Sequence, residues 1–343
     1  MKLKHLTAFT VLCLLIALPL HGQDSPRSPK TSNYRLSGPY THKNLTVFLV
    51  HGKDQTTRTF LTLQEALAQK KVKVYETRDV NELAIRNLSN QDIYVQSGDI
   101  VRGGDQDRMI SMDFIVPPRS GRMPIAAFCV ESGRWSKRGT EESAVFTSSD
   151  NAAATKELKL AAKSENSQQA VWQNVSLAQE KLSRSVGADV SSPASSSSLE
   201  LSIENSKVKE TSTAYIDELS GILKNKPDVI GYVFAINGKV NSADVYASRA
   251  LFAKLWPKLL KASAVEAIAE LNTHTDEAKP VARETVETFL TDSEKPAGAA
   301  TDVTQRVRMV KRETTRTSSS KLSTAIRKMA GSTETTSKNS EER

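Results

Sequence analysis

The sequence is poor in cysteine and histidine, and this scarcity excludes several kinds of site. Only two cysteines occur, Cys13 and Cys129. If an N-terminal segment containing Cys13 is removed, Cys129 stands alone and no intramolecular disulfide can stabilise the fold. The histidines beyond residue 22 (His42, His51 and His274) lack the short spacings of structural zinc sites, so the sequence predicts no metal site and no cofactor.

Long apolar runs are also missing after Leu20, which excludes a polytopic membrane protein. The one apolar run, Leu6–Leu20, follows the basic residues Lys2 and Lys4 and precedes Gly22. It is shorter than the roughly 20 residues that a membrane span needs. The pattern predicts a signal peptide over residues 1–22, cleaved near Gly22, and an exported (periplasmic or secreted) protein without a transmembrane span.

The formal charge of +8 lies mostly at the two ends of the chain. The body between them is almost neutral, so nucleic acid is not an expected partner despite the basic pI. Residues 23–33 are rich in Ser, Pro and Lys and predict a flexible lead-in. Residues 296–343 form a basic Ser/Thr-rich tail that we expect to be largely disordered.

The remaining residues, 34–295, predict one α+β domain. Short β-rich runs separated by turn residues fill 34–150 and favour an antiparallel β-sandwich or barrel-like part. Residues 151–295 predict a helical part containing one β-hairpin, whose turn is Asn237-Gly238. Between them, residues 189–198 (DVSSPASSSS) have the composition of a flexible linker.

The densest group of chemically active side chains is at 98–108, GDIVRGGDQDR. Its glycines permit positive φ angles and close approach of backbone N–H groups to a ligand. Its arginines, Arg102 and Arg108, offer forked donors that suit phosphate or carboxylate. The alternative is a tight turn between two strands with solvated charges. The segment is not a P-loop, because the Gly-Lys-Ser/Thr ending is missing.

A second group, CVESGRW at 129–135, ends a predicted strand. Cys129 lies between apolar neighbours, so we expect a buried core residue rather than a nucleophile. The charges of Glu131 and Arg134 need partners if they lie near buried positions. Trp135 could stack on a base or sugar ring, or cover the core.

Together with the segments NG, ADVY and LWPKLL between residues 237 and 260, these two groups resemble the ARPP domain family, the ADP-ribosylglycohydrolase- and rhodanese-phosphatase-associated protein domain. The resemblance spans about residues 34–290. It implies that the polar motif residues of the family fall on Gln106, Arg108, Glu131, Arg134 and Trp135, and it carries over no activity.

We therefore expect an exported domain that binds a small polar ligand, phosphorylated or ADP-ribose-like. The expected ligand-binding residues are Arg102, Gln106, Arg108, Glu131, Arg134 and Trp135. One alternative is a hydrolase that uses Glu131 or Asp99 as general base. Another is a structural or interaction protein without a ligand. Arginines and Glu131 in an open cleft would favour binding or catalysis, whereas a closed network of ion pairs would favour a structural role.

Overall fold

The computed structural model describes residues 34–136, 138, 146–152, 155–271, 281–294, 300–304 and 307–310. The predicted signal peptide (1–22), the lead-in (23–33) and most of the basic tail lie outside these residues. Among the helices in the part that is described, none has the length and apolar character needed to cross a bilayer.

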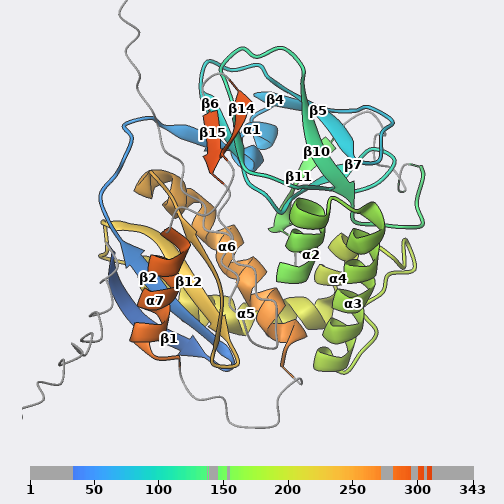
Figure 1. Cartoon of the computed structure of the whole chain (residues 1–343). Coiled ribbons are helices and arrows are strands. Elements are labelled where there is room, and N and C mark those ends of the chain that lie inside the picture. Colours follow the sequence, from blue (N-terminus) through green and yellow to red (C-terminus); the bar gives the residue numbers. More distant parts are fainter. Residues whose placement is uncertain are drawn as a thin grey trace, which may run out of the picture. The chain divides into compact units, whose positions relative to one another are not determined.

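A four-stranded antiparallel sheet joins residues from both halves of the sequence (Figure 1). Its order is β1 (Arg35–His42), β2 (Leu45–His51), β12 (Val229–Ile236) and β13 (Lys239–Val245). Strands β12 and β13 are the predicted hairpin, and both turn residues, Asn237 and Gly238, have the positive φ angles of a type I′ turn.

Every residue of β2 and β12 is buried, because both faces of this sheet are covered. Val47 and Leu49 belong to the cluster that includes helix α6 (Arg249–Ala269). The N-cap of α6 is Ser248, as the sequence predicts from a serine that precedes a helical apolar pattern. The alternate residues, Phe48 and Val50, pack with helix α7 (Arg283–Glu294) on the opposite face. This explains the uninterrupted apolar run of β2, since neither face of the strand is solvated.

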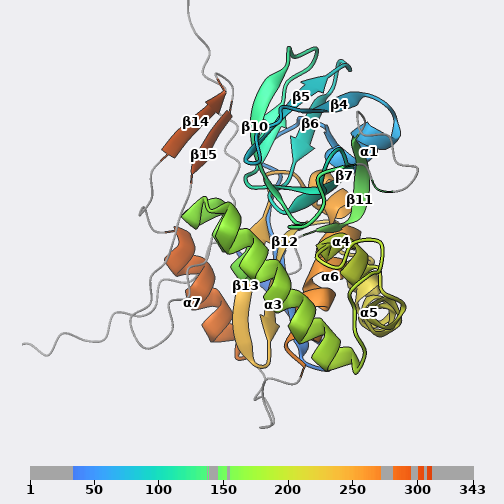
Figure 2. The ribbon, with the colours of Figure 1, turned by 90° about the vertical axis from the view of Figure 1, so that its right-hand side faces the viewer.

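The second large sheet has six antiparallel strands and curls into a half-barrel (Figure 2). Its order is β11 (Phe146–Ala152), β7 (Asp99–Gly103), β8 (Arg108–Ile110), β10 (Met123–Cys129), β5 (Glu82–Asn87) and β4 (Val72–Glu76). The short helix α1 (Leu63–Ala68) contacts both end strands, β4 and β11. The curl therefore brings the two end strands of the sheet, β4 and β11, near each other. We call the place where they meet the seam of the half-barrel.

A smaller sheet joins β3 (Phe60–Thr62), β6 (Asp92–Val95) and β9 (Phe114–Val116), with β3 parallel to β6. Sequence patterning predicts a single strand over 109–116, but the structure divides it between β8 and β9. Asp113 lies at the break, where its carboxylate accepts hydrogen bonds from the Tyr94 hydroxyl and from the Ser97 backbone N–H, both at 3.0 Å. These bonds turn the chain between two sheets.

The helical part also differs from expectation at one point. A single helix is predicted over 154–182, whereas the structure has α2 (Lys156–Leu160), a π-helical turn (Ala161–Glu165) and α3 (Gln168–Val186). Asn166 adopts the left-handed conformation, φ 49°, and Ser167 then caps α3. The remaining helices are α4 (Leu199–Ile203), α5 (Ser206–Leu219) and a 3₁₀ turn (Ser220–Leu223). Further along, β14 (Ala300–Thr304) and β15 (Val307–Val310) form a hairpin.

The Ser-rich segment 189–198 packs onto the domain rather than spanning solvent as a linker. Val190 and Ser198 are buried, and Ser198 caps α4. Ser197 Oγ accepts hydrogen bonds from the backbone N–H groups of Ser132 and Gly133, both at 3.1 Å. Small hydroxyl side chains here satisfy local backbone groups, a role that composition does not distinguish from flexibility. The fold class is thus α+β, as predicted, and one of its core clusters combines residues from both halves of the sequence.

Candidate functional site

The glycine-rich group at 98–108 is a strand, a turn and a strand. Strand β7 ends at Gly103, and β8 begins at Arg108. Gly103 and Gly104 have φ angles of 120° and 59°, which only glycine adopts readily. Asp107 closes the turn, because its Oδ1 accepts from the Gly103 backbone N–H at 3.1 Å. The turn alternative is therefore the local conformation, and it carries a buried carboxylate.

Asp107 and Glu131 are fully buried and share two arginines. Arg134 Nε lies 2.8 Å from Glu131 Oε2, and Arg134 Nη2 lies 3.4 Å from Asp107 Oδ1. Arg138 Nη1 lies 3.2 Å from Asp107 Oδ2 and 3.7 Å from Glu131 Oε1. We call these four residues the acid–arginine network. Its two carboxylates and two guanidinium groups balance in charge, which compensates the cost of burying them.

The electrostatics of the network are dominated by burial. Burial raises the pKa of Asp107, the nearby charge of Arg138 lowers it, and the charge of Glu131 raises it again. Arg134 also donates from Nη1 to the carbonyl oxygens of Gly104 and Ser136, at 3.2 Å and 2.6 Å. Its donors are thus engaged within the protein, and the network ties the turn after β7 to the segment after β10.

Arg108 makes a different set of contacts. Its Nη2 lies 2.9 Å from Glu76 Oε1, and its Nη1 donates to the carbonyl oxygen of Val80 at 2.7 Å. These bonds connect β8 to the end of β4 and to the loop that joins β4 and β5. Cys129, on the neighbouring strand, is buried as predicted, and burial raises the pKa of its thiol to about 11. A thiol with that pKa is protonated at neutral pH and is a poor nucleophile.

The other predicted site residues are dispersed. Arg102 pairs with Glu204 at 2.8 Å, next to the buried Glu200. Trp135 is 58% exposed, so it does not cover the core. Asp99, proposed as a general base, lies 2.8 Å from Lys258 Nζ.

Gln106 is fully buried, and neither polar atom of its side chain has a hydrogen-bond partner among the described residues. The structure thus brings Glu131 and Arg134 together, adds Asp107 and Arg138, and leaves Arg102, Arg108 and Trp135 in other surroundings. Arg138 was missed by sequence reasoning. The sequence contained one indication of it: two carboxylates, if buried, need two cationic partners.

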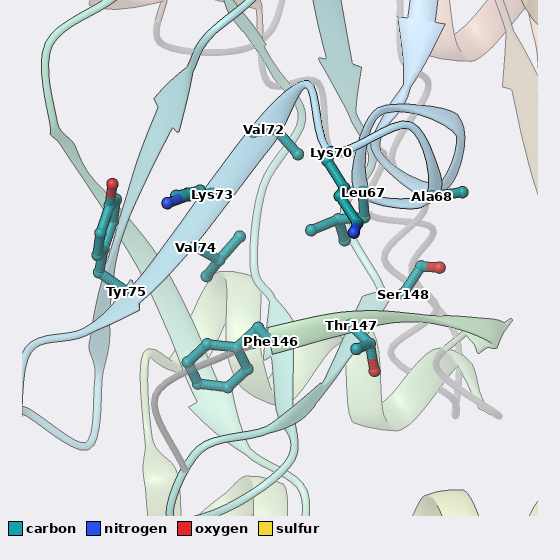
Figure 3. A pocket seen from close by; sticks show the side chains of 10 residues that line it. All are labelled: Leu67, Ala68, Lys70, Val72, Lys73, Val74, Tyr75, Phe146, Thr147 and Ser148. Carbon is teal, nitrogen blue, oxygen red and sulfur yellow. The ribbon is translucent and has the colours of Figure 1, made fainter. Parts of the chain in front are cut away.

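A cavity of about 410 Å³ opens at the seam of the half-barrel, between β4 with α1 on one side and β11 on the other. Figure 3 shows Val72 and Val74 on β4, Leu67 on α1 and Phe146 on β11 around it. The other lining residues are Ala68, Lys70, Lys73, Tyr75, Thr147 and Ser148. Lys70 and Lys73 are exposed, whereas Val72, Val74 and Phe146 are buried. The cavity therefore has an apolar interior and a basic rim.

The acid–arginine network supports one wall of this cavity. The carbonyl oxygen of Gly104 accepts a hydrogen bond from the Arg134 guanidinium, and the Phe146 ring lies against Gly104. A Cβ atom at position 104 would lie 2.5 Å from Phe146 Cζ, closer than atoms pack. The predicted polar residues thus position the turn against which Phe146, a cavity residue, rests.

Metal ligands do not gather in the described part of the chain, where no three His, Cys, Asp or Glu side chains are grouped to hold an ion.

Comparisons with known proteins assign the chain to a family. No curated protein and no solved structure matches the chain. Residues 33–333 match the family described as the ARG and Rhodanese-Phosphatase-superfamily-associated Protein domain, ARPP-1, and because this match covers most of the sequence, the chain belongs to that family.

Proposed function

We propose that this protein is an exported domain that binds a small molecule with an apolar body and one anionic group, such as a phosphate or a carboxylate. The observation that carries the proposal is the seam cavity. Its volume of about 410 Å³ falls within the range typical of small-molecule sites. Lys70 and Lys73 at the rim supply positive charge near the entrance.

The geometry favours this cavity over the predicted arginine site. Arg134 is nearly buried and its donors are occupied by Glu131, Asp107 and two carbonyl oxygens. A ligand anion would have to displace a buried carboxylate, which leaves an unpaired charge. The seam cavity asks for no such displacement, because Leu67, Val74 and Phe146 present only carbon atoms to it.

Binding can be tested with the fluorescent probe anilinonaphthalene sulfonate, an apolar ring system with one anionic group. We expect saturable binding to the folded protein. Lys70→Gln combined with Lys73→Gln should raise the Kd about 2- to 30-fold, since each exposed charge contributes roughly 0.2–1 kcal/mol. Lys209→Gln, which removes an exposed lysine of α5, is the matched control and should leave Kd unchanged.

A second variant tests whether the probe binds in the seam cavity. Ser148 lies half-buried on β11 at the cavity, so Ser148→Trp should fill the entrance and abolish probe binding while the urea midpoint stays near that of the original protein. Undiminished binding by Ser148→Trp would place the probe elsewhere and contradict the proposal.

Export rests on the basic, apolar and small-residue pattern of residues 1–22. In its native host the protein should begin near Gln23 and occur in the periplasmic or secreted fraction. N-terminal sequencing of material from the cytoplasm that begins at Met1 would contradict this part of the proposal.

A second candidate function is binding of a small polar ligand at the acid–arginine network. The observation that favours it is Gln106, a fully buried amide that finds no hydrogen-bond partner in the described part of the chain and that precedes Asp107. Buried amides are normally satisfied. If this site binds ADP-ribose, that compound should raise the melting temperature of the protein and of Ser148→Trp, but not of Gln106→Leu. An equal shift for Gln106→Leu would reject this candidate.

A further inference from the structure

Three strands of the four-stranded sheet bring a serine, a histidine and an aspartate together at one end. Ser37 lies on β1, His51 is the last residue of β2, and Asp228 immediately precedes β12. The register places Arg35 opposite His51, and His51 opposite Val229 on the other side. The strand pairing therefore fixes the three side chains relative to one another on rigid elements.

The hydrogen bonds run in one chain through the imidazole. His51 Nε2 lies 2.7 Å from Ser37 Oγ, and His51 Nδ1 lies 2.8 Å from Asp228 Oδ1. His51 is buried, while Ser37 is half-buried. These are the distances at which a histidine base activates a serine hydroxyl and a carboxylate orients the histidine.

The carboxylate favours one tautomer of His51. An ionised Asp228 has only acceptor lone pairs, so Nδ1 carries the proton in the tautomer that bonds to Asp228. Nε2 then presents its lone pair to the Ser37 hydroxyl, as a general base requires. Arg35 Nη2 lies 2.5 Å from Asp228 Oδ2, and the bonds with His51 and Arg35 lower the pKa of Asp228.

Arg35 also introduces a competing arrangement, because its Nη2 lies 2.8 Å from His51 Nδ1. In the opposite tautomer Arg35 would donate to Nδ1, and Nε2–H would donate to Ser37. That state would be a purely structural hydrogen-bond chain for a buried histidine. The two tautomers differ in one measurable property, the nucleophilicity of Ser37.

The backbone around Ser37 is held in an irregular conformation. The β1–β2 register shifts between Ser37 and Tyr40, and Gly38 has φ 111°. Arg283 of α7 donates to the carbonyl oxygens of Leu36 and Gly38, both at 2.9 Å, on either side of the serine. The Tyr40 hydroxyl lies 3.4 Å from Ser37 Oγ and can donate a hydrogen bond to it.

We propose that Ser37, His51 and Asp228 form a nucleophile, base and orienting acid that hydrolyse small carboxylic esters. Ser37 Oγ attacks the ester carbonyl carbon while its proton moves to His51 Nε2. The C–O bond to the leaving alcohol then breaks, and His51 returns the proton to the alcohol oxygen. Water repeats both steps on the acyl-serine, releasing the carboxylic acid and restoring the Ser37 hydroxyl. The Tyr40 hydroxyl stands where it can donate to the developing oxyanion.

A fluorophosphonate probe tests the nucleophile directly, because it reacts with activated serines by losing fluoride. We expect covalent labelling of the folded protein at Ser37, located by peptide mass spectrometry. Ser37→Ala should abolish the label, and the control Ser196→Ala, which alters an exposed serine, should retain it. Absence of label at Ser37, or an equal label in Ser37→Ala, would overturn the proposal.

Hydrolysis of p-nitrophenyl acetate tests whether His51 acts as the base and Asp228 as the group that orients it. His51→Gln and Asp228→Asn should each lower kcat/KM at least about 100-fold. The Asp228 side chain is 47% exposed, so its variant should fold even if His51→Gln does not. Arg35→Met removes the competitor for Nδ1 and should retain or increase the rate. A loss of activity in Arg35→Met with unchanged rates in Asp228→Asn would mean that Nδ1 accepts a hydrogen bond from Arg35, and it would overturn the proposed roles of His51 and Asp228.

Probe binding at the seam cavity should be unaffected by Ser37→Ala, so the esterase proposal and the binding proposal can be rejected independently.

Discussion

Gly104 and Phe146 lie in such close contact that a single methyl group at position 104 would be 2.5 Å from the phenyl ring. Gly104 follows β7 and Phe146 begins β11, and the two strands are paired at Gly103 and Phe146. The contact connects the acid–arginine network, which holds the Gly104 carbonyl, with the seam cavity, which Phe146 lines.

Gly104→Ala should therefore disturb both features. The φ angle of 59° strains any residue with a Cβ, and the methyl group also forces the Phe146 ring to move. We expect a loss of about 2–4 kcal/mol in the free energy of unfolding, from left-handed strain and overpacking together, and weaker probe binding. Gly121→Ala is the control, because nothing lies within 4 Å of its Cβ position. Urea unfolding of both variants measures the difference, and equal midpoints would contradict the proposed contact.

Arg134→Met should destabilise the fold strongly. It leaves Asp107 and Glu131, both fully buried, with Arg138 as the remaining member of the network. Breaking a buried ion pair in this way costs about 3–5 kcal/mol. Lys207→Met, which removes an exposed pair with Glu210, should cost less than about 1 kcal/mol.

The double variant refines this test. Adding Glu131→Gln to Arg134→Met removes the uncompensated charge, so part of the stability should return and the two changes should not be additive. A cost for Arg134→Met as small as that for Lys207→Met would mean that the guanidinium is not part of a buried network.

Cys129 should react slowly in the native protein. Its burial and its pKa of about 11 keep the thiol both inaccessible and protonated at pH 8. Iodoacetamide should alkylate it at least about 100-fold more slowly in the folded chain than in guanidinium chloride, since only the thiolate reacts. Cys129→Ala should cost about 1–2 kcal/mol, as ordinary core changes do. Equal rates in the two solvents would contradict its burial.

The elements that local chemistry determines were predictable from the sequence. Asn237-Gly238 forms the expected turn, Ser248 caps the expected helix, and the apolar run of β2 is buried. Strand β11 was not predicted, because its sequence, FTSSDNA, has little apolar alternation and depends on pairing with β7. A strand whose stability comes from its partner carries a weak local signal.

In the candidate site too, features that depend on local sequence were predictable, and features that depend on contacts between distant segments were not. That Cys129 is buried could be inferred from its apolar neighbours. The cavity could not, because it exists only where the curl of a six-stranded sheet brings β4 to β11, far apart in the chain. Nor could the pairing of Arg134 with both Glu131 and Asp107, which depends on two connections meeting at one end of the sheet.

Glu266 provides a pH-dependent test of the core. It is buried on α6, where its Oε1 accepts from the Lys156 backbone N–H at 2.8 Å and from Asn241 Nδ2 at 2.9 Å. Burial raises its pKa, the charge of Lys159 and these hydrogen bonds lower it in part, and the charge of Glu157 raises it. Since the folded-state pKa exceeds the unfolded value, the native state binds the proton more tightly. This contribution to stability is complete below about pH 4 and is lost as pH rises through the folded-state pKa.

Glu266→Gln replaces the carboxyl by a neutral group of the same shape that can still accept both hydrogen bonds through its oxygen. Its melting temperature should match that of the original protein near pH 4 and exceed it at higher pH, because the original carboxyl binds its proton more tightly in the folded than in the unfolded state. Calorimetric melting temperatures at several pH values give this difference, and contributions from Asp107 and Glu200, whose pKa values burial also raises, cancel in the comparison. Glu210→Gln, on the exposed surface of α5, should show no such divergence. A Glu266→Gln variant that is less stable at pH 8 than at pH 4 relative to the original protein would show that Glu266 is ionised and paired in the folded state.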